Sequence, residues 1–366
     1  MATLEYRPDR VSPPGDTLSD LLEERRISQK QLAVRLARSD KLINEIIKGK
    51  ATISSDLALD LERVLGTPAR FWLNRESAYR EWLARNARPN PSAQELEWTK
   101  LFPYPAMVRY GWVPAANPGP ERVYALLQFF GMASLQAYRS YWEDRSAMVR
   151  FRRSDLVEDR LHLVSAWLRQ GEIQSSSIEA ASYDEPAFRD AVTRARGWTQ
   201  LAPRKFVPLL KEAFAQAGVI IEFVPELPSL GVSGAVRWKR PDCALMQISL
   251  RYKRNDHFWF TLFHECAHVI KHKKKSVFLE VSGEKDADER DADRMAATLL
   301  IPSSRYAEFV RGEDFSRIAV KLFAEAIGIA PGIVVGRLQH DNLLPHKQLN
   351  DLKVKYEWIK PGHAGW

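Results

Sequence analysis

The apolar residues between positions 17 and 83 recur at helical spacing, with short polar breaks between the runs. Apolar positions three or four apart form one face of an α-helix, so this pattern predicts a compact all-helical unit. Its expected core consists of Leu18, Leu21, Leu22, Leu32, Leu36, Ile43, Ile46, Ile47, Leu57, Leu61 and Leu65. The stretch 86–92, NARPNPS, breaks the pattern as a linker does, and we therefore expect a first domain over residues 1–85.

Helical spacing resumes after the linker and continues to about Gln216. The apolar runs YALLQFFG, LVEDRLHLVSAWLRQ, FRDAVTRAR and RKFVPLLKEAFAQAG are each bounded by glycine, proline or serine. We assign residues 95–200 to a helical middle segment, in which we find no chemical motif.

Three short runs at 219–224, 232–238 and 243–250 are rich in β-branched residues and separated by proline and glycine. They predict the strands of a small, mainly antiparallel sheet. Apolar and polar residues alternate from Met246 to Arg251, which predicts that one face of the third strand points inward.

Two helices are expected after the strands, at about 256–272 and 284–300, and a further helical pair between Phe315 and His340. These elements define a third domain over residues 201–345. The whole chain is predicted to be of the α+β class, with an all-α amino-terminal domain, a helical middle segment and a carboxyl-terminal domain that contains the small antiparallel sheet.

Composition and charge narrow the choice of function only slightly. The 366 residues are enough for two or three domains, and 45% hydrophobic with 27% charged residues is typical of a soluble globular protein. No apolar run approaches the roughly 20 residues of a membrane span, and the start of the chain lacks the apolar stretch of a signal peptide. We therefore expect a cytoplasmic protein with no membrane partner and with Cys243 and Cys266 reduced. The net charge of +8 suits a nucleic-acid partner but is also common on soluble surfaces.

The first helix after the strands contains the motif H-E-x-x-H, formed by His264, Glu265 and His268. Residues four apart lie on one helix face, so both imidazoles can reach one metal ion, while Glu265 can address a water in an open coordination position. The third ligand must come from elsewhere, and Glu289 at the start of the next predicted helix is the candidate. Asp293, one turn later, can accept a hydrogen bond from the free ring nitrogen of a ligand histidine. The alternative is that these carboxylates only form a solvated acidic face.

The segments SGAVRW, ISLRYKRNDHFWFTLFHECAHVIKH and ERDADRMAATLLIP together resemble the ImmA/IrrE family of metallo-endopeptidases, over about residues 200–340. The resemblance implies a zincin-like domain in which His264, His268 and Glu289 hold zinc, with manganese or another divalent metal as an alternative, and in which Glu265 is the general base. Family members cleave helix-turn-helix repressors and so release transcription. Cys266 and Met295 depart from the family pattern, but neither is a ligand, and we expect Cys266 to be a buried thiol.

Zinc lowers the pKa of its bound water towards about 7, and the general base passes the proton on to the leaving amine. Such a mechanism needs a further donor to the developing oxyanion. The candidates, which the sequence does not rank, are Arg251, Tyr252, His257 and His272. The strand at 232–238 is a candidate for binding the substrate backbone by strand addition.

The stretch SQKQLAVRLARSDKLINEIIKGK predicts a helix-turn-helix. Ser28 is the expected N-cap of the first helix, Ala37, Arg38 and Ser39 form the turn, and a second helix capped by Ser39 ends at Gly49. The polar residues left outside on the second helix form the face that would enter a major groove of DNA. A polar face on a protein-binding domain is the alternative.

Asn44 is the candidate for recognising a base, and lysines 41, 48 and 50 are candidates for phosphate contacts. The full set of predicted DNA contacts is Gln29, Ser39, Lys41, Asn44, Lys48 and Lys50. With its flanking segments, VSPPGDTLSDLLEERRISQKQLA and ALDLERVLGTPARFWLNRESAY, this domain resembles the HigA-like antitoxin branch of the XRE-type regulators. Ala37 stands where these regulators usually have glycine; a left-handed conformation there costs on the order of 1 kcal/mol.

Three functions from different classes are compatible with these features. The chain is an active peptidase that cuts a repressor or antitoxin while bound to operator DNA, or a HigA-like antitoxin and transcriptional regulator whose metal domain is only a sensor, or a peptidase that processes its own helix-turn-helix. The presence of Glu265 beside a complete ligand set favours the first. The expected partners are operator DNA, a repressor or antitoxin substrate and a cognate toxin, and a homodimer stays open.

Overall fold

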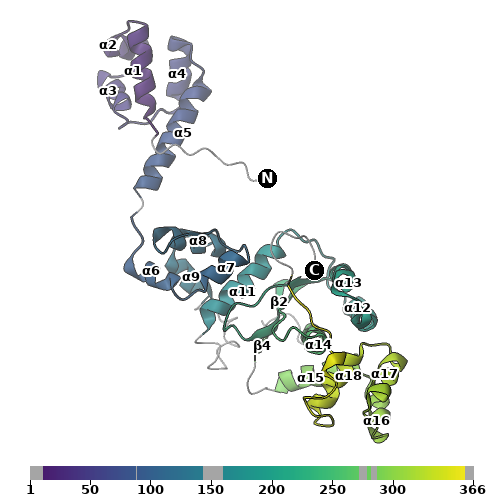
Figure 1. The fold of residues 1–366 in the computed structure, drawn as a ribbon. Coiled ribbons are helices and arrows are strands. Elements are labelled where there is room, and N and C mark those ends of the chain that lie inside the picture. Colours follow the sequence, from purple (N-terminus) through teal and green to yellow (C-terminus); the bar gives the residue numbers. More distant parts are fainter. Residues whose placement is uncertain (1–10, 88, 143–159, 272–277, 282–286, 359–366) are drawn as a thin grey trace. The chain divides into compact units, whose positions relative to one another are not determined.

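The computed structural model describes residues 11–87, 89–142, 160–271, 278–281 and 287–358 (Figure 1). The chain divides into two compact units, Met1–Asn90 and Pro91–Trp366. The division lies within the stretch that the sequence predicts as a linker. The fold is mixed and rich in helices, with one small sheet in the second unit.

The first unit is all helical. Its helices are α1 (Pro14–Glu24), α2 (Gln29–Arg35), α3 (Asp40–Ile47), α4 (Ser55–Leu65) and α5 (Ala69–Asn86). The core contains nine of the eleven apolar positions expected from the sequence, together with Trp72, while Leu21 and Ile47 pack partly buried against it. The helical periodicity therefore identified this core correctly.

The second unit surrounds the sheet with helices. Its amino-terminal helices are α6 (Ala93–Thr99), α7 (Tyr104–Arg109), α8 (Pro120–Phe130), α9 (Leu135–Trp142), α11 (Leu161–Gln174), α12 (Glu185–Gly197), η2 (Trp198–Gln200) and α13 (Pro203–Gln216). The strands are β1 (Val219–Phe223), β2 (Val232–Arg240), β3 (Cys243–Ile248) and β4 (Phe278–Val281). The remaining helices are α14 (Asn255–Lys271), α15 (Ala287–Leu300), α16 (Ser303–Arg311), α17 (Arg317–Ala326), α18 (Pro331–His340) and η3 (Asn350–Leu352).

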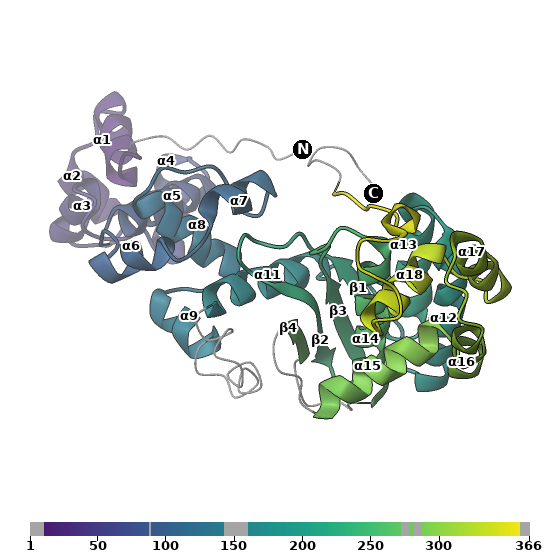
Figure 2. The same cartoon turned by 60° about the horizontal axis from the view of Figure 1, so that its bottom comes forward.

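The sheet has the strand order β1-β3-β2-β4 (Figure 2). The pairings of β2 with β3 and with β4 are antiparallel, as expected, whereas β1 pairs with β3 in parallel, which the sequence did not predict. Over residues 234–236, β2 is paired with β3 on one side and with β4 on the other, so the strand does not offer a continuous open edge. The expectation that the 232–238 strand binds a substrate by strand addition is therefore wrong.

The expected inward face of β3 is buried, and the opposite face is buried as well, since every residue of this strand is buried. The polar side chain of Gln247 is only 1% exposed, and its Nε2 donates to the carbonyl oxygen of Trp167 on α11 at 3.0 Å. Gly171, also on α11, lies so close that a Cβ there would meet the Gln247 amide at 2.1 Å. Helix α11 therefore covers the second face of the sheet at this position, and Gln247, the polar residue of β3, is its hydrogen-bond partner.

Among the described residues, no single helix is long and apolar enough to cross a bilayer. The pair α17 and α18 satisfies the length and composition test only as a broken span, bent by 114°.

Candidate metal centre and nucleic-acid interface

Helix α14 is buried along almost its whole length, and His264, Glu265 and His268 are at most 1% exposed. Its beginning is fixed by a segment from the end of the described chain. The Asn255 side chain accepts a hydrogen bond from the backbone N–H of Val354 at 3.0 Å, and Asp256 forms a buried ion pair with Lys353. The sequence motif gave no indication of this anchor.

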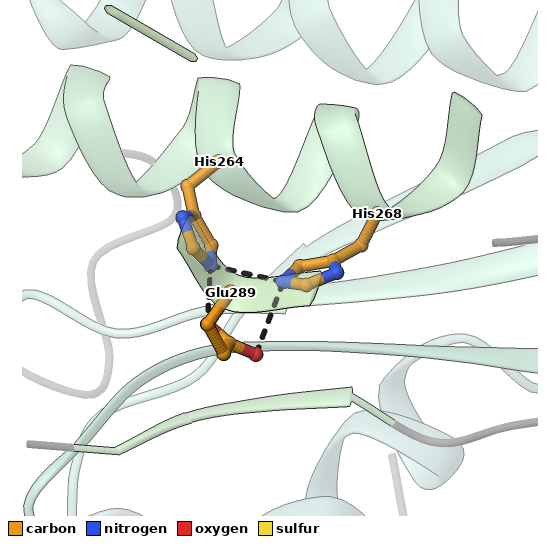
Figure 3. Close-up of side chains that lie close together, drawn as sticks. All are labelled: His264, His268 and Glu289. Atoms are coloured by element: carbon orange, nitrogen blue, oxygen red, sulfur yellow. Dashed lines mark hydrogen bonds and ion pairs between the residues drawn. The ribbon is translucent and has the colours of Figure 1, made fainter. Parts of the chain in front are cut away.

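The three predicted ligand side chains converge on one point (Figure 3). His264 and His268 extend from successive turns of α14, and Glu289 reaches them from α15, which packs beside α14. The Nε2 atoms of the two histidines lie 2.9 Å apart. A Glu289 carboxylate oxygen lies 3.0 Å from Nε2 of His264, and the other lies 3.4 Å from Nε2 of His268.

These separations suit a shared divalent ion. Ligand atoms about 2.0–2.2 Å from a tetrahedral zinc are about 3.3–3.5 Å from one another, close to the arrangement found here. Oδ1 of Asp293 lies 3.0 Å from Nδ1 of His264 and accepts a hydrogen bond from the N–H at that position. In this tautomer the lone pair of the imidazole is on Nε2, the atom that faces the other ligand atoms. The donor set, two imidazoles and a carboxylate, is of the kind that zinc prefers and leaves a coordination position open.

The two neighbouring histidines keep the carboxyl group of Glu289 deprotonated. Burial by itself would raise the pKa of this carboxyl group. Hydrogen bonds and charge from His264 and His268 outweigh burial, so the pKa of Glu289 is lowered below its ordinary value. Glu289 is therefore held as a carboxylate, the form that binds a metal.

Glu265 is fully buried and lies against β2. A Cβ added at Gly234 would come within 2.4 Å of its Oε1, so glycine at this strand position is what leaves room for the carboxylate. Gly234 could not be recognised from the sequence, because its importance comes from a contact between elements far apart in the chain.

Three of the four proposed oxyanion donors lie together at the amino-terminal end of α14. The rings of Tyr252 and His257 stack at 4.3 Å, and the Arg251 guanidinium lies 5.0 Å from the Tyr252 ring centre. His257 precedes His264 by two helical turns, about 10 Å along the helix axis, so this group is separate from the ligand atoms. Burial lowers the pKa of His257. His272 lies outside the described residues.

Cys266 is a buried free thiol in the core between sheet and helices, as expected. Burial raises its pKa well above the usual value, so the thiol stays protonated and is a poor metal ligand. Cys243 is likewise buried and free.

The first unit has the helix-turn-helix connection that the sequence predicts. Ser28 caps α2 in a reciprocal capping box with Gln31, and the Ser39 hydroxyl accepts from the Leu42 N–H at 3.2 Å to cap α3. Ala37 in the turn has a φ of 51°, the left-handed conformation for which glycine is preferred.

Five of the six predicted DNA contacts line one surface hollow of about 480 Å³, whose wall also includes Lys30, Asp40 and Glu45. The five are Gln29, Lys41, Asn44, Lys48 and Lys50. Ser39 is not part of the wall and acts as the cap of α3. The Asn44 amide donates weakly to Gln29 at 3.5 Å, so the base-recognition candidate is held towards the start of α2. Lys30 is a basic residue of this surface that the sequence analysis missed.

No family model matches the chain. A segment of 66 residues is 27% identical to the HTH-type transcriptional regulator YddM of Escherichia coli. This aligned segment covers 18% of the present chain and 70% of YddM. The first unit therefore contains a helix-turn-helix region similar to that of a transcriptional regulator.

Two solved structures are similar over about a fifth of the chain. The Pseudomonas aeruginosa antitoxin HigA, solved with the higBA promoter, is 37% identical, with 21% of this chain and 86% of that chain covered and a TM-score of 0.21. An addiction module antidote protein of the HigA family from Coxiella burnetii is 36% identical, with 20% and 83% covered and a TM-score of 0.20.

Proposed function

We propose that this protein is a DNA-binding regulator whose second unit is a zinc-dependent endopeptidase of the ImmA/IrrE type. The observation that supports the enzyme most strongly is the convergence of His264, His268 and Glu289 within one buried cluster, with their ligand atoms all within 4.8 Å of one another. An incidental acidic face would be solvated, whereas the side chain of Glu289 is only 21% exposed and is directed at two buried histidines.

In this proposal each polar residue has a separate task. His264, His268 and Glu289 hold the zinc, which supplies Lewis-acid polarisation of the scissile carbonyl and a more acidic water. Asp293 fixes the tautomer and ring orientation of His264. Glu265 takes the proton of the attacking water and delivers it to the leaving amine.

The substrate class follows from the first unit and from the resemblance of the metal domain. ImmA/IrrE peptidases cut helix-turn-helix repressors, and we propose a repressor or antitoxin as the substrate here. Binding of the first unit to operator DNA would raise the concentration of the peptidase near such a substrate.

For the DNA-binding role, the supporting observations are the two capped helices and the hollow lined by four lysines around Asn44. The similarity to YddM agrees with this role. Lysines on such a surface bind phosphates without regard to sequence, and an amide can recognise adenine in the major groove.

The decisive experiment compares the wild type with Glu265→Gln, each expressed beside the neighbouring repressor or antitoxin. Glu265 is not a ligand in this proposal, so the variant should keep its zinc and lose about 10²- to 10⁴-fold in cleavage rate. The partner and the chain's own first unit are followed by immunoblot, and metal content by elemental analysis.

Fragments of the partner that appear only with the wild type support the peptidase. A released fragment of about residues 1–85 indicates self-processing instead. If neither protein is cut across oxidative, DNA-damage and metal stress while both chains still repress a promoter, the second candidate holds. It is a HigA-like regulator whose metal centre senses without cutting, the reading that the similarity to YddM favours.

A further inference from the structure

A cavity of about 250 Å³ lies between α14, α15 and α18, beside the proposed metal centre. These three helices pack next to one another in the second unit (Figure 2). Most of its wall is apolar, and the apolar residues are Phe260, Ala297, Leu300, Ile301 and Ile333. Asp293 belongs to the wall, whereas the ligand candidates are not among the described residues that line it.

The cavity also has a buried acceptor in its wall. Asp256 is 6% exposed, and its Oδ2 is paired with Lys353 at 2.5 Å. Its other oxygen, Oδ1, is buried and has no hydrogen-bond partner among the described residues. Because this oxygen has no accessible surface, a molecule in the cavity does not reach it, and Asp256 contributes to the wall as a neutralised partner of Lys353.

The charges around the cavity already have partners. Lys353 offsets Asp256, Arg337 donates to Asp341 at 2.7 Å, and Arg294 pairs with Asp291. A charged ligand would lose its hydration in the cavity and find no unpaired opposite charge there, and this desolvation would cost free energy. The wall therefore suits a neutral molecule.

We propose that this cavity binds a small neutral, mostly apolar molecule, and that its occupancy is transmitted to the proposed metal centre through Asp293. An apolar protein cavity of about 150 Å³ is known to accept benzene, so 250 Å³ is enough for a bicyclic aromatic molecule. The transmission rests on the proposed function of the metal centre, whereas the binding itself does not.

Asp293 connects the two sites directly. It lines the cavity, and its Oδ1 lies 3.0 Å from Nδ1 of His264. A ligand that contacts Asp293 changes how firmly the imidazole of His264 is oriented, and ligand orientation affects metal affinity. Such a coupling is reciprocal, so zinc must change the affinity for the cavity ligand by the same factor.

The first experiment measures binding of 5-fluoroindole to the full chain by ¹⁹F NMR. This probe is neutral and mostly apolar, and the cavity volume is large enough for its bicyclic ring. Ala297→Phe fills the cavity and should abolish binding. Thr298→Phe, which adds the same ring one position on at an exposed site of α15, should leave it unchanged.

If Ala297→Phe does not fold, as judged by circular dichroism, Ala297→Met provides a smaller filling group. No binding to the wild type, or equal binding to a folded filling variant, overturns the site.

The second experiment compares probe affinity in the metal-free and the zinc-saturated chain. We expect at least a fivefold difference, which Asp293→Ala should remove while the probe still binds. Equal affinities in both states of the wild type would overturn the coupling and leave the cavity site standing. A chain that takes up no zinc would refute the proposed metal centre instead, and the probe titration of the metal-free chain would be unaffected.

Discussion

The proposed metal centre and the proposed DNA-binding face both use helical spacing, but one is buried and the other is exposed to solvent. On α14, His264 is completely buried, and each polar group contacts another that holds it in place. On α3, the side chain of Lys41 is 84% exposed and has only a 3.9 Å ion pair with Glu45. The positions of the side chains on α14 are fixed by contacts with neighbouring residues. The side chain of Lys41 on α3 is accessible to solvent, and its charge determines what it can bind.

This difference determines how each region should respond to change. In the buried centre, removal of one side chain leaves its partners without hydrogen bonds in an apolar environment, so effects are large and not additive. On the exposed face, each lysine adds a similar, salt-dependent share, and effects are modest and nearly additive. The following predictions test this contrast, beginning with the largest effect.

Loss of a ligand should empty the metal centre. We expect about one zinc per chain in protein purified without chelator, and almost none in His264→Ala or Glu289→Ala, because two remaining ligands do not hold the ion. His340→Ala, an exposed histidine of α18, is the matched control and should retain the metal. Elemental analysis decides, and an emptied His340→Ala would mean that the ligands are misassigned.

Substitution of Asp293, which orients the candidate ligand His264, should have a smaller effect on zinc binding than loss of a ligand. Asp293→Ala should lower zinc affinity about 10- to 100-fold, because His264 loses the acceptor that fixes its ring. Competition with a chromophoric chelator measures this change. Asp291→Ala removes an exposed carboxylate from the same helix and should have no comparable effect. Equal losses in both variants would point to general electrostatics.

Substitutions of Asn44 and Lys48 should differ in how the loss of DNA affinity depends on sequence and on salt. Asn44→Ala should weaken binding to the operator by about 1–3 kcal/mol with little change for unrelated DNA. Lys48→Ala should weaken binding to both and lower the slope of log affinity against log salt by about one. Fluorescence anisotropy across a salt series distinguishes them. Unchanged operator binding in the double variant would indicate a protein-binding domain.

The smallest effect concerns the turn of the helix-turn-helix. Ala37→Gly should stabilise the first unit by about 1 kcal/mol, because it relieves a left-handed alanine. Gly66→Ala is the reverse control, since it creates such an alanine at a φ of 69° with no atoms within 4 Å of the new Cβ. Thermal unfolding of residues 1–90 should show shifts of opposite sign. Shifts of the same sign would contradict the argument from strain.

The convergence of His264, His268 and Glu289 was predictable from sequence, because the spacing within each helix is local. His264 and His268 are one helical turn apart, and Asp293 follows Glu289 by one turn on the next helix. Gly234 and the Asp256–Lys353 pair could not be predicted, since each depends on which distant elements pack together. The cavity wall combines three helices and has no sequence signature for the same reason.

The sheet shows a similar limit. Alternation along β3 correctly indicated a strand, but its polar residue, Gln247, donates to Trp167 on α11 and does not face water. Period-two alternation reports polarity on one side of a strand, and it does not say whether water or a hydrogen-bonding helix is the partner. The starts of α2 and α3 were easier to predict from sequence, because the hydroxyls of Ser28 and Ser39 accept from backbone N–H groups only three residues away.

The anchor of α14 has a consequence for protein synthesis. Val354 is 99 residues beyond Asn255, the helix residue it bonds to. At about 5–20 residues per second, a ribosome needs about 5–20 s to add that length. The helix that carries both histidines is thus made well before the segment that fixes its beginning, whereas the first unit is already complete. A nascent chain can therefore fold its helix-turn-helix while α14 still lacks this anchor, so the arrangement of His264 and His268 is completed only after synthesis has passed residue 354.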